Sequence, residues 1–204
     1  KVQVTVSVSK DGKFLNDKDG NPMAGRSITL TGKNTYNMDD ALKLAHDLYY
    51  PGGAEAGYDY HEDENGIYDG IIYKLWGYNK NDVPNIKSIL NHDTRNLGSA
   101  LSRTVQNGDE LHFFIQAQNG KDKFAFFTET EATYTQGQEI TLKLRQRNDF
   151  GGCFSNCTGA SIYINGVKQE ELLTDSEGNV TLPKLEAGQS YLITAEKLIN
   201  TSDG

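Results

Sequence analysis

The pattern of apolar and polar positions predicts a chain of short strands with one clear helix. Between Asn37 and Gly53, apolar side chains recur at steps of three and four, which places them on one face of a helix. The residues of this stripe are Met38, Ala41, Leu42, Ala45, Leu48 and Tyr49. Asn37 is a favourable N-cap, and Pro51 followed by two glycines predicts the helix end. We expect the stripe to pack against a sheet.

Strict alternation predicts the strands around this helix. Four valines alternate with polar residues at the start of the chain: Val2, Val4, Val6 and Val8. Further strands are expected at Ser27–Thr31, Ile71–Trp76, Glu110–Gln116 and Phe124–Thr128, with a hairpin at Asn119–Gly120 between the last two. The segment 78–102 shows no clear period, and the spacing of its isoleucines and leucine (Ile86, Ile89, Leu90) indicates a turn of helix.

The pattern changes near Gln136–Gly137. From there on, short alternating runs are separated by turn residues every eight to twelve positions, and no helical period appears. This is typical of a small antiparallel sandwich. We therefore predict an α+β domain with its helix on one sheet face at 1–136, an all-β antiparallel sandwich domain at 137–200, and a polar tail at 201–204.

Length and charge exclude some classes of partner. The chain has 204 residues and a net charge of −8, which argues against nucleic acid or an anionic membrane as its partner. It has no apolar run near the length of a membrane-spanning helix. Because it begins at Lys1 inside a strand pattern and without Met, we expect a mature or trimmed chain whose targeting segments are absent.

The two cysteines, Cys153 and Cys157, lie four positions apart in a glycine-rich loop. A disulfide would close this short loop and would place the protein outside the reducing cytoplasm. Free thiols and a metal site are the alternatives, although a metal would need two further ligands that are not nearby in sequence.

Aromatic side chains beside amides indicate a binding surface. Alternation along Glu110–Gln116 turns Leu111, Phe113 and Ile115 towards the helix, which leaves Phe114 on the opposite face, where Trp76 and Phe127 are also expected. Aromatic rings near amides suit sugars or a flat ring system. The predicted ligand-binding residues are Tyr58, Tyr60, Tyr73, Trp76, Tyr78, Asn79 and Phe114. The alternatives are edge-strand packing, or coverage of this face by the second domain or by residues 78–102.

The loop between Gly57 and Asp69 is rich in oxygen ligands. Asp59, Asp63, Asn65 and Asp69 are weak Ca²⁺ candidates, but their spacing is not that of an EF-hand loop. We expect a solvated acidic loop here and predict no metal site.

No sequence motif predicts catalysis. The chain lacks a nucleophile elbow, a zinc-protease helix motif and a phosphate loop. The four histidines (His46, His61, His92 and His112) are scattered along it. We therefore predict a protein that is not an enzyme, with an unrecognised hydrolase as the weakest option.

Several motifs resemble a known family. Met38–Tyr50 with Pro51-Gly52-Gly53, the run Lys74-Leu75-Trp76-Gly77, and Val105–Leu111 leading into Phe113-Phe114 resemble the transcobalamin-like C-terminal domain family, a β-grasp-type module of bacterial surface proteins. Residues 137–198 resemble the Ig-like or carboxypeptidase-regulatory-like sandwiches that follow such modules. The matching pieces there are Ile164-Asn165-Gly166, Thr174–Val180 and Leu185–Tyr191.

The resemblance implies an extracellular, Gram-positive cell-surface protein with a β-grasp-like first domain. By resemblance only, it also implies a corrinoid as one ligand, and no other cofactor is predicted. We expect a non-enzymatic binding module that recognises a small molecule, a glycan or a surface protein. The alternative is a structural spacer or adhesin segment with no small-molecule ligand.

Overall fold

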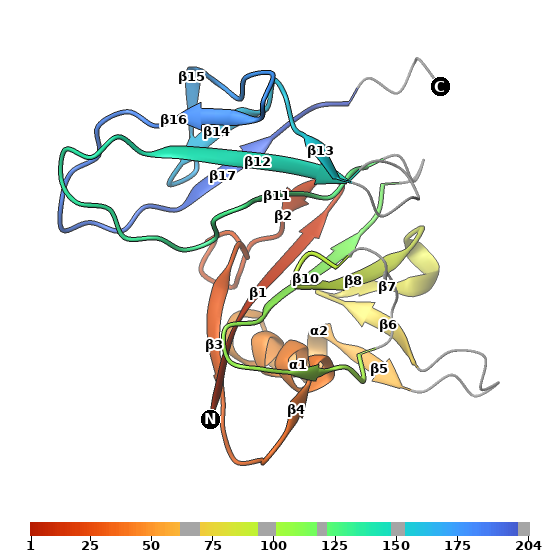
Figure 1. Cartoon of the computed structure of the whole chain (residues 1–204). Coiled ribbons are helices and arrows are strands. Elements are labelled where there is room, and N and C mark those ends of the chain that lie inside the picture. Colours follow the sequence, from red (N-terminus) through yellow and green to blue (C-terminus); the bar gives the residue numbers. More distant parts are fainter. Residues whose placement is uncertain (62–69, 94–100, 118–121, 148–153, 200–204) are drawn as a thin grey trace. The chain divides into compact units, whose positions relative to one another are not determined.

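The computed structural model describes residues 1–61, 70–93, 101–117, 122–147 and 154–199 (Figure 1). Within these residues, strands are far more common than helices. The chain divides into two compact units, Lys1–Asp122 and Lys123–Gly204. This division lies before the boundary expected near residue 136, so the first unit is shorter than predicted.

The first unit is built around a mixed sheet with the valine-rich strand β1 (Val2–Lys10) at its centre. β1 pairs antiparallel with β3 (Arg26–Leu30) and with the short β2 (Lys13–Phe14), and parallel with β10 (Glu110–Ile115). β10 in turn pairs antiparallel with β8 (Ile86–Leu90). Figure 1 shows β1 and β10, which come from opposite ends of this unit's sequence, side by side.

The predicted helix is α1 (Met38–Tyr49), and it ends where Pro51 follows in the sequence. Its buried face contains Met38, Ala41, Leu42 and Ala45, as expected, but Leu48 is 42% exposed. His46, which the apolar pattern did not include, is buried on this face of the helix, whereas Leu48 is not. A short helix that the sequence did not predict, α2 (Gly53–Gly57), follows. No helix among the described residues is both long and apolar enough to cross a membrane.

The core of the first unit lies between this sheet and α1. Leu111, Phe113 and Ile115 of β10 are buried there, as the alternation predicted, and α1 contacts β1 and β3. Two smaller sheets border this core. Their strands are β5 (Asp59–His61), β6 (Ile71–Leu75) and β7 (Tyr78–Asn79) in one, and β4 (Tyr36–Asn37) and β9 (Thr104–Val105) in the other. A 3-10 turn, η1 (Lys80–Asp82), follows β7.

Two predictions for the region before residue 136 are wrong, one about an element type and one about a strand pairing. Residues Ile86–Leu90 form the strand β8 and not a turn of helix, because pairing with β10 outweighs the helix-like spacing of three apolar residues. The strand near Phe124–Thr128 exists as β11 (Ala125–Phe127), but it pairs with β12 (Thr141–Arg147) and not with β10. The hairpin turn expected at Asn119–Gly120 lies outside the described residues.

The second unit contains two antiparallel sheets, as its pattern predicted. A four-stranded sheet contains β11, β12, β13 (Phe154–Asn156) and β16 (Asn179–Thr181). A three-stranded sheet contains β15 (Val167–Leu173), β14 (Ser161–Ile164) and β17 (Ile193–Glu196). One apolar cluster joins residues of both sheets: Leu142, Ile162, Val180 and Leu182.

Candidate functional site

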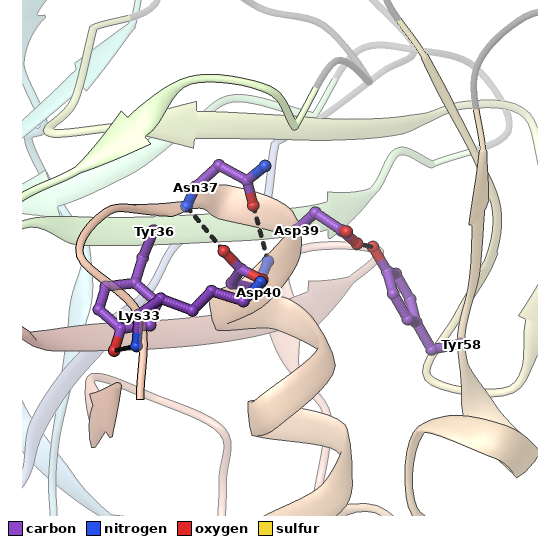
Figure 2. A network of polar contacts seen from close by, with 6 residues as sticks. All are labelled: Lys33, Tyr36, Asn37, Asp39, Asp40 and Tyr58. Atoms are coloured by element: carbon purple, nitrogen blue, oxygen red, sulfur yellow. Dashed lines mark hydrogen bonds and ion pairs between the residues drawn. The ribbon is translucent and has the colours of Figure 1, made fainter. Parts of the chain in front are cut away.

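The start of α1 is held by a network of polar contacts (Figure 2). Asn37 Oδ1 accepts a hydrogen bond from the Asp40 N–H (2.9 Å), and Asp40 Oδ2 accepts one from the Asn37 N–H (3.2 Å). This reciprocal capping box satisfies two donors that the helix leaves free. Lys33 forms an ion pair with Asp40, and its N–H donates to the Tyr36 hydroxyl at 2.7 Å. Asp39, in the same first turn of α1, lies next to this cap in the sequence.

Tyr58 contacts the first turn of α1, so its hydroxyl already has a partner within the protein. Its hydroxyl donates a hydrogen bond to Asp39, as Figure 2 shows. Burial, and then Asp39, raise the pKa of Tyr58 above its ordinary value, so the phenol stays protonated. A predicted ligand residue thus connects the segment after α2 to the helix start.

His46 is the centre of a buried aromatic cluster. Its Nδ1 lies 2.8 Å from the Leu42 carbonyl oxygen, and its Nε2 lies 3.1 Å from the Trp76 backbone nitrogen, which donates to it. This arrangement needs a neutral ring that carries its proton on Nδ1. Burial lowers the pKa of His46 to about 4, which keeps the ring neutral at pH 7. Its ring stacks with Tyr58 at 5.0 Å between centroids.

Trp76 lies inside the helix-facing core and not on the opposite face. Only 5% of it is exposed, and its ring contacts His46 and Tyr50 at centroid distances of 4.6 and 5.3 Å. The expected alternation stops at Leu75 because Trp76 and Gly77 are the two central residues of the β6–β7 turn, both with positive φ. The indole N–H donates to the Asn16 carbonyl at 2.9 Å. The prediction that Trp76 shares a surface with Phe114 is therefore wrong.

Tyr60 is also committed to the fold of the first unit. Its hydroxyl accepts a hydrogen bond from the Leu101 N–H at 3.1 Å, and its ring is half-buried against the core. A Cβ on Gly70 would lie 2.1 Å from that hydroxyl, so Gly70 provides the space that Tyr60 occupies. Tyr58, Tyr60 and Trp76 are thus held in or against the core of the first unit.

The remaining aromatic residues of β6 and β7, Tyr73 and Tyr78, are not part of the core cluster of the first unit. Tyr73 stacks on His61 with 4.0 Å between ring centroids, and the Lys80 ammonium lies 5.4 Å from the Tyr73 centroid. Tyr78 is 38% exposed, and the adjacent Asn79 donates through its side chain to Asp82 at 3.0 Å. We call Tyr73, Tyr78, Asn79, His61 and Lys80 the aromatic surface.

Phe114 and Phe127 belong to different sheets. Phe114 is a half-buried residue of β10, on the face opposite α1, as expected from the alternation. Phe127 is a residue of β11 in the second unit and packs against the apolar clusters there. The single apolar face expected from Trp76, Phe114 and Phe127 therefore does not exist as one sheet surface.

A group of metal-ligating side chains that the sequence analysis did not single out lies at the other end of β10. The ligand atoms of His92, Glu110 and His112 all lie within 4.8 Å of one another. Glu110 Oε2 is 3.0 Å from His92 Nε2 and 3.7 Å from His112 Nε2. The three side chains are 18%, 20% and 19% exposed, respectively. Burial lowers the pKa of His112, which favours the neutral imidazole that binds metals.

Two of the three members of this group could be placed together from the sequence. Glu110 and His112 are two positions apart in a predicted strand, so they share a face. His92 lies in a stretch without a period, and only the pairing of β8 with β10 brings it to them.

Most of the weak Ca²⁺ candidates and one of the two cysteines lie outside the described residues. Asp59 is described, and its Oδ1 lies 3.4 Å from His61 Nδ1, whereas Asp63, Asn65 and Asp69 are not described. Cys157 is buried and is bonded to no other cysteine among the described residues, and burial raises the pKa of its thiol. Its predicted disulfide partner Cys153 lies outside the described residues.

Comparison with known proteins adds no relative to this picture. No family model matches the chain, and no curated protein or solved structure is similar to it.

Proposed function

We propose that this chain is a non-enzymatic binding module of an extracellular bacterial surface protein, which recognises a small ligand or a surface partner through the aromatic surface. The observation that carries the proposal is the stacked pair of His61 and Tyr73, with Lys80 over the ring and exposed Tyr78 close by in sequence. Ring faces fixed on paired strands bind with a small loss of conformational freedom.

The chemistry of this surface favours a ligand with both an apolar face and polar groups. Tyr73 and Tyr78 offer aromatic area, Lys80 and Asn79 offer a positive charge and an amide, and Asp59, beside His61, adds a negative charge. A sugar ring or a flat heterocycle has this combination. A corrinoid remains a ligand suggested by family resemblance only.

A β-grasp-like fold of the first unit is part of the proposal. Its support is the order β3-β1-β10-β8 with a parallel central pair, and α1 following β3 and packing on the sheet. An Ig-like or regulatory-like sandwich for the second unit is supported by its two antiparallel sheets around one apolar cluster. Both resemble modules that bacterial surface proteins combine, which supports the extracellular location.

The test is a thermal-shift screen of the full chain with glycans, corrinoids and haem. Saturation at 100 times the dissociation constant would stabilise the chain by about 2.7 kcal/mol. We expect Tyr73→Ala and Tyr78→Ala to remove the shift, and Tyr134→Ala, which removes an aromatic side chain from a loop of the second unit, to keep it. A ligand shift that survives both β6–β7 variants would contradict this surface.

A spacer or adhesin segment is the second candidate, and one observation favours it. The side chains of Tyr58, Tyr60 and Trp76 form hydrogen bonds within the first unit, so their polar groups are already used by the fold. The absence of a shift with every ligand class, together with normal folding of both β6–β7 variants, would support the spacer.

A further inference from the structure

We propose that His92, Glu110 and His112 form a binding site for a divalent transition-metal ion, for which Zn²⁺ is the natural probe. This site lies at the start of β10 and in the turn after β8, and it does not depend on the aromatic surface.

The donor set suits such an ion. Two imidazoles and one carboxylate are ligands that Zn²⁺ and its neighbours in the first transition row accept, whereas Ca²⁺ and Mg²⁺ prefer sites made of oxygen atoms alone. Three protein ligands leave a further coordination position for water or for a donor atom of another molecule.

The distances also fit. Bonds of about 2.0–2.2 Å from Zn²⁺ to nitrogen and oxygen separate neighbouring ligand atoms by about 3.4 Å in a tetrahedron. Glu110 Oε2 lies 3.0 Å from His92 Nε2 and 3.7 Å from His112 Nε2, so the two separations lie on either side of that value. The imidazole centroids are 5.3 Å apart with a tilt of 34°, so the rings do not stack face to face. The ligand atoms of His92 and His112 lie within 4.8 Å of each other, so the two imidazoles would turn towards a common ion on binding.

The backbone conformation at His92 supports the site independently of the ligand distances. Asn91 and His92 have φ of 49° and 59°, and the Asp93 N–H donates to the Leu90 carbonyl at 3.0 Å. Two successive positive φ values and this hydrogen bond describe a two-residue turn of the kind that favours Asn followed by Gly. His92 occupies the glycine position, where a side chain is strained. Its imidazole is thereby directed towards Glu110.

Polar contacts hold this turn against the start of β10. The Asn91 side chain donates to Asp109 Oδ1 at 2.7 Å and accepts from the Glu110 N–H at 2.8 Å. The Asn91 N–H donates to the Glu110 carbonyl at 2.9 Å. Asp109 Oδ2 in turn accepts from the Gln106 N–H at 2.7 Å. These bonds fix the positions of two ligands before a metal arrives, which is how surrounding groups support metal sites.

The experiment is calorimetric titration of the tag-free, EDTA-treated full chain with ZnCl₂, with CaCl₂ and MgCl₂ as comparisons. We expect one Zn²⁺ per chain and no comparable binding of the two hard cations. Glu110→Gln and His112→Asn should each weaken Zn²⁺ binding at least tenfold. X-ray absorption of the Zn²⁺-loaded chain should report two imidazoles and oxygen donors.

Two further variants make the test decisive. His92→Gly removes a ligand but suits the turn, so it should remain folded by circular dichroism and still lose at least tenfold in Zn²⁺ affinity. His61→Asn is the matched control, because His61 lies 3.4 Å from Asp59 in a pair that no third metal-ligating side chain joins among the described residues. It should leave the affinity unchanged. Absence of Zn²⁺ binding, or full affinity in His92→Gly, would overturn the proposal.

Discussion

Two hairpin-like turns of this protein share a backbone shape but carry different residues. Between β14 and β15, Asn165 and Gly166 have φ of 49° and 80°. After β8, Asn91 and His92 have φ of 49° and 59°. The turn of the second unit has the residues that its conformation favours. In the first unit, a histidine stands where glycine would cost less.

The turn between β6 and β7 also contains a residue that its backbone conformation does not favour. Trp76, with φ of 50°, stands at the first central position of this turn, where Asn would be easier. Its side chain is almost fully buried and hydrogen-bonded to the Asn16 carbonyl, so tertiary contacts offset the local strain. A residue that opposes its local backbone thus indicates a role elsewhere: packing for Trp76, and in our proposal metal binding for His92.

The largest expected effect comes from Trp76→Asn. Asn suits the turn, but the substitution removes a buried indole and its hydrogen bond, so we expect a loss of about 3–5 kcal/mol in the free energy of unfolding. Asn165→Ala in the second unit loses the hydrogen bond from the Leu192 N–H to its side chain and places Ala at a positive φ, so it should cost about 2 kcal/mol. Urea unfolding followed by backbone amide signals of each unit measures both. Equal losses would contradict the comparison.

The next largest effect should be a loss of stability in acid that affects the first unit through His46. The unfolded His46 binds a proton near its ordinary pKa of 6.5, but the folded ring does so only near about 4. The stabilisation from His46 is therefore complete above about pH 6.5 and falls by about 1.4 kcal/mol per pH unit down to about 4. All four histidines precede residue 123, so this effect is confined to the first unit.

Fluorescence measures this prediction directly, because Trp76 is the only tryptophan and lies against His46. The urea concentration at the midpoint of the fluorescence transition should decrease as the pH is lowered from 6.5 to 4.5. His46→Gln cannot titrate and should show a shallower pH dependence, although its stability at neutral pH is lower. An unchanged slope in this variant would assign the acid sensitivity to other groups.

The smallest effects should have opposite signs in the two matched turns. His92→Gly relieves a strained φ and should raise the stability of the metal-free chain by up to about 1 kcal/mol. Gly166→Ala should lower it by about 1 kcal/mol through its positive φ alone, because an added Cβ meets nothing within 4 Å. Thermal unfolding in EDTA measures both. A loss of stability in His92→Gly would show that His92 serves the fold.

Local chemistry explains which predictions from the sequence were confirmed. The helix cap at Asn37 and the turn residues that separate the strands of the second unit, such as Asn165–Gly166, depend on residues a few positions apart. The alternation of valines in β1 indicates a strand whose sheet has one face in the core. Such features need only propensity and the period of side chains along one element, which the sequence contains in full.

The sequence by itself thus determined the predicted helix, most strands and the change in pattern between the two units. Only the tertiary structure decided that β10 lies beside β1, that Trp76 turns into the core, and that His92 meets Glu110 and His112. The physical reason is that these arrangements join residues distant in sequence, and the choice among them depends on how much apolar surface the whole unit buries.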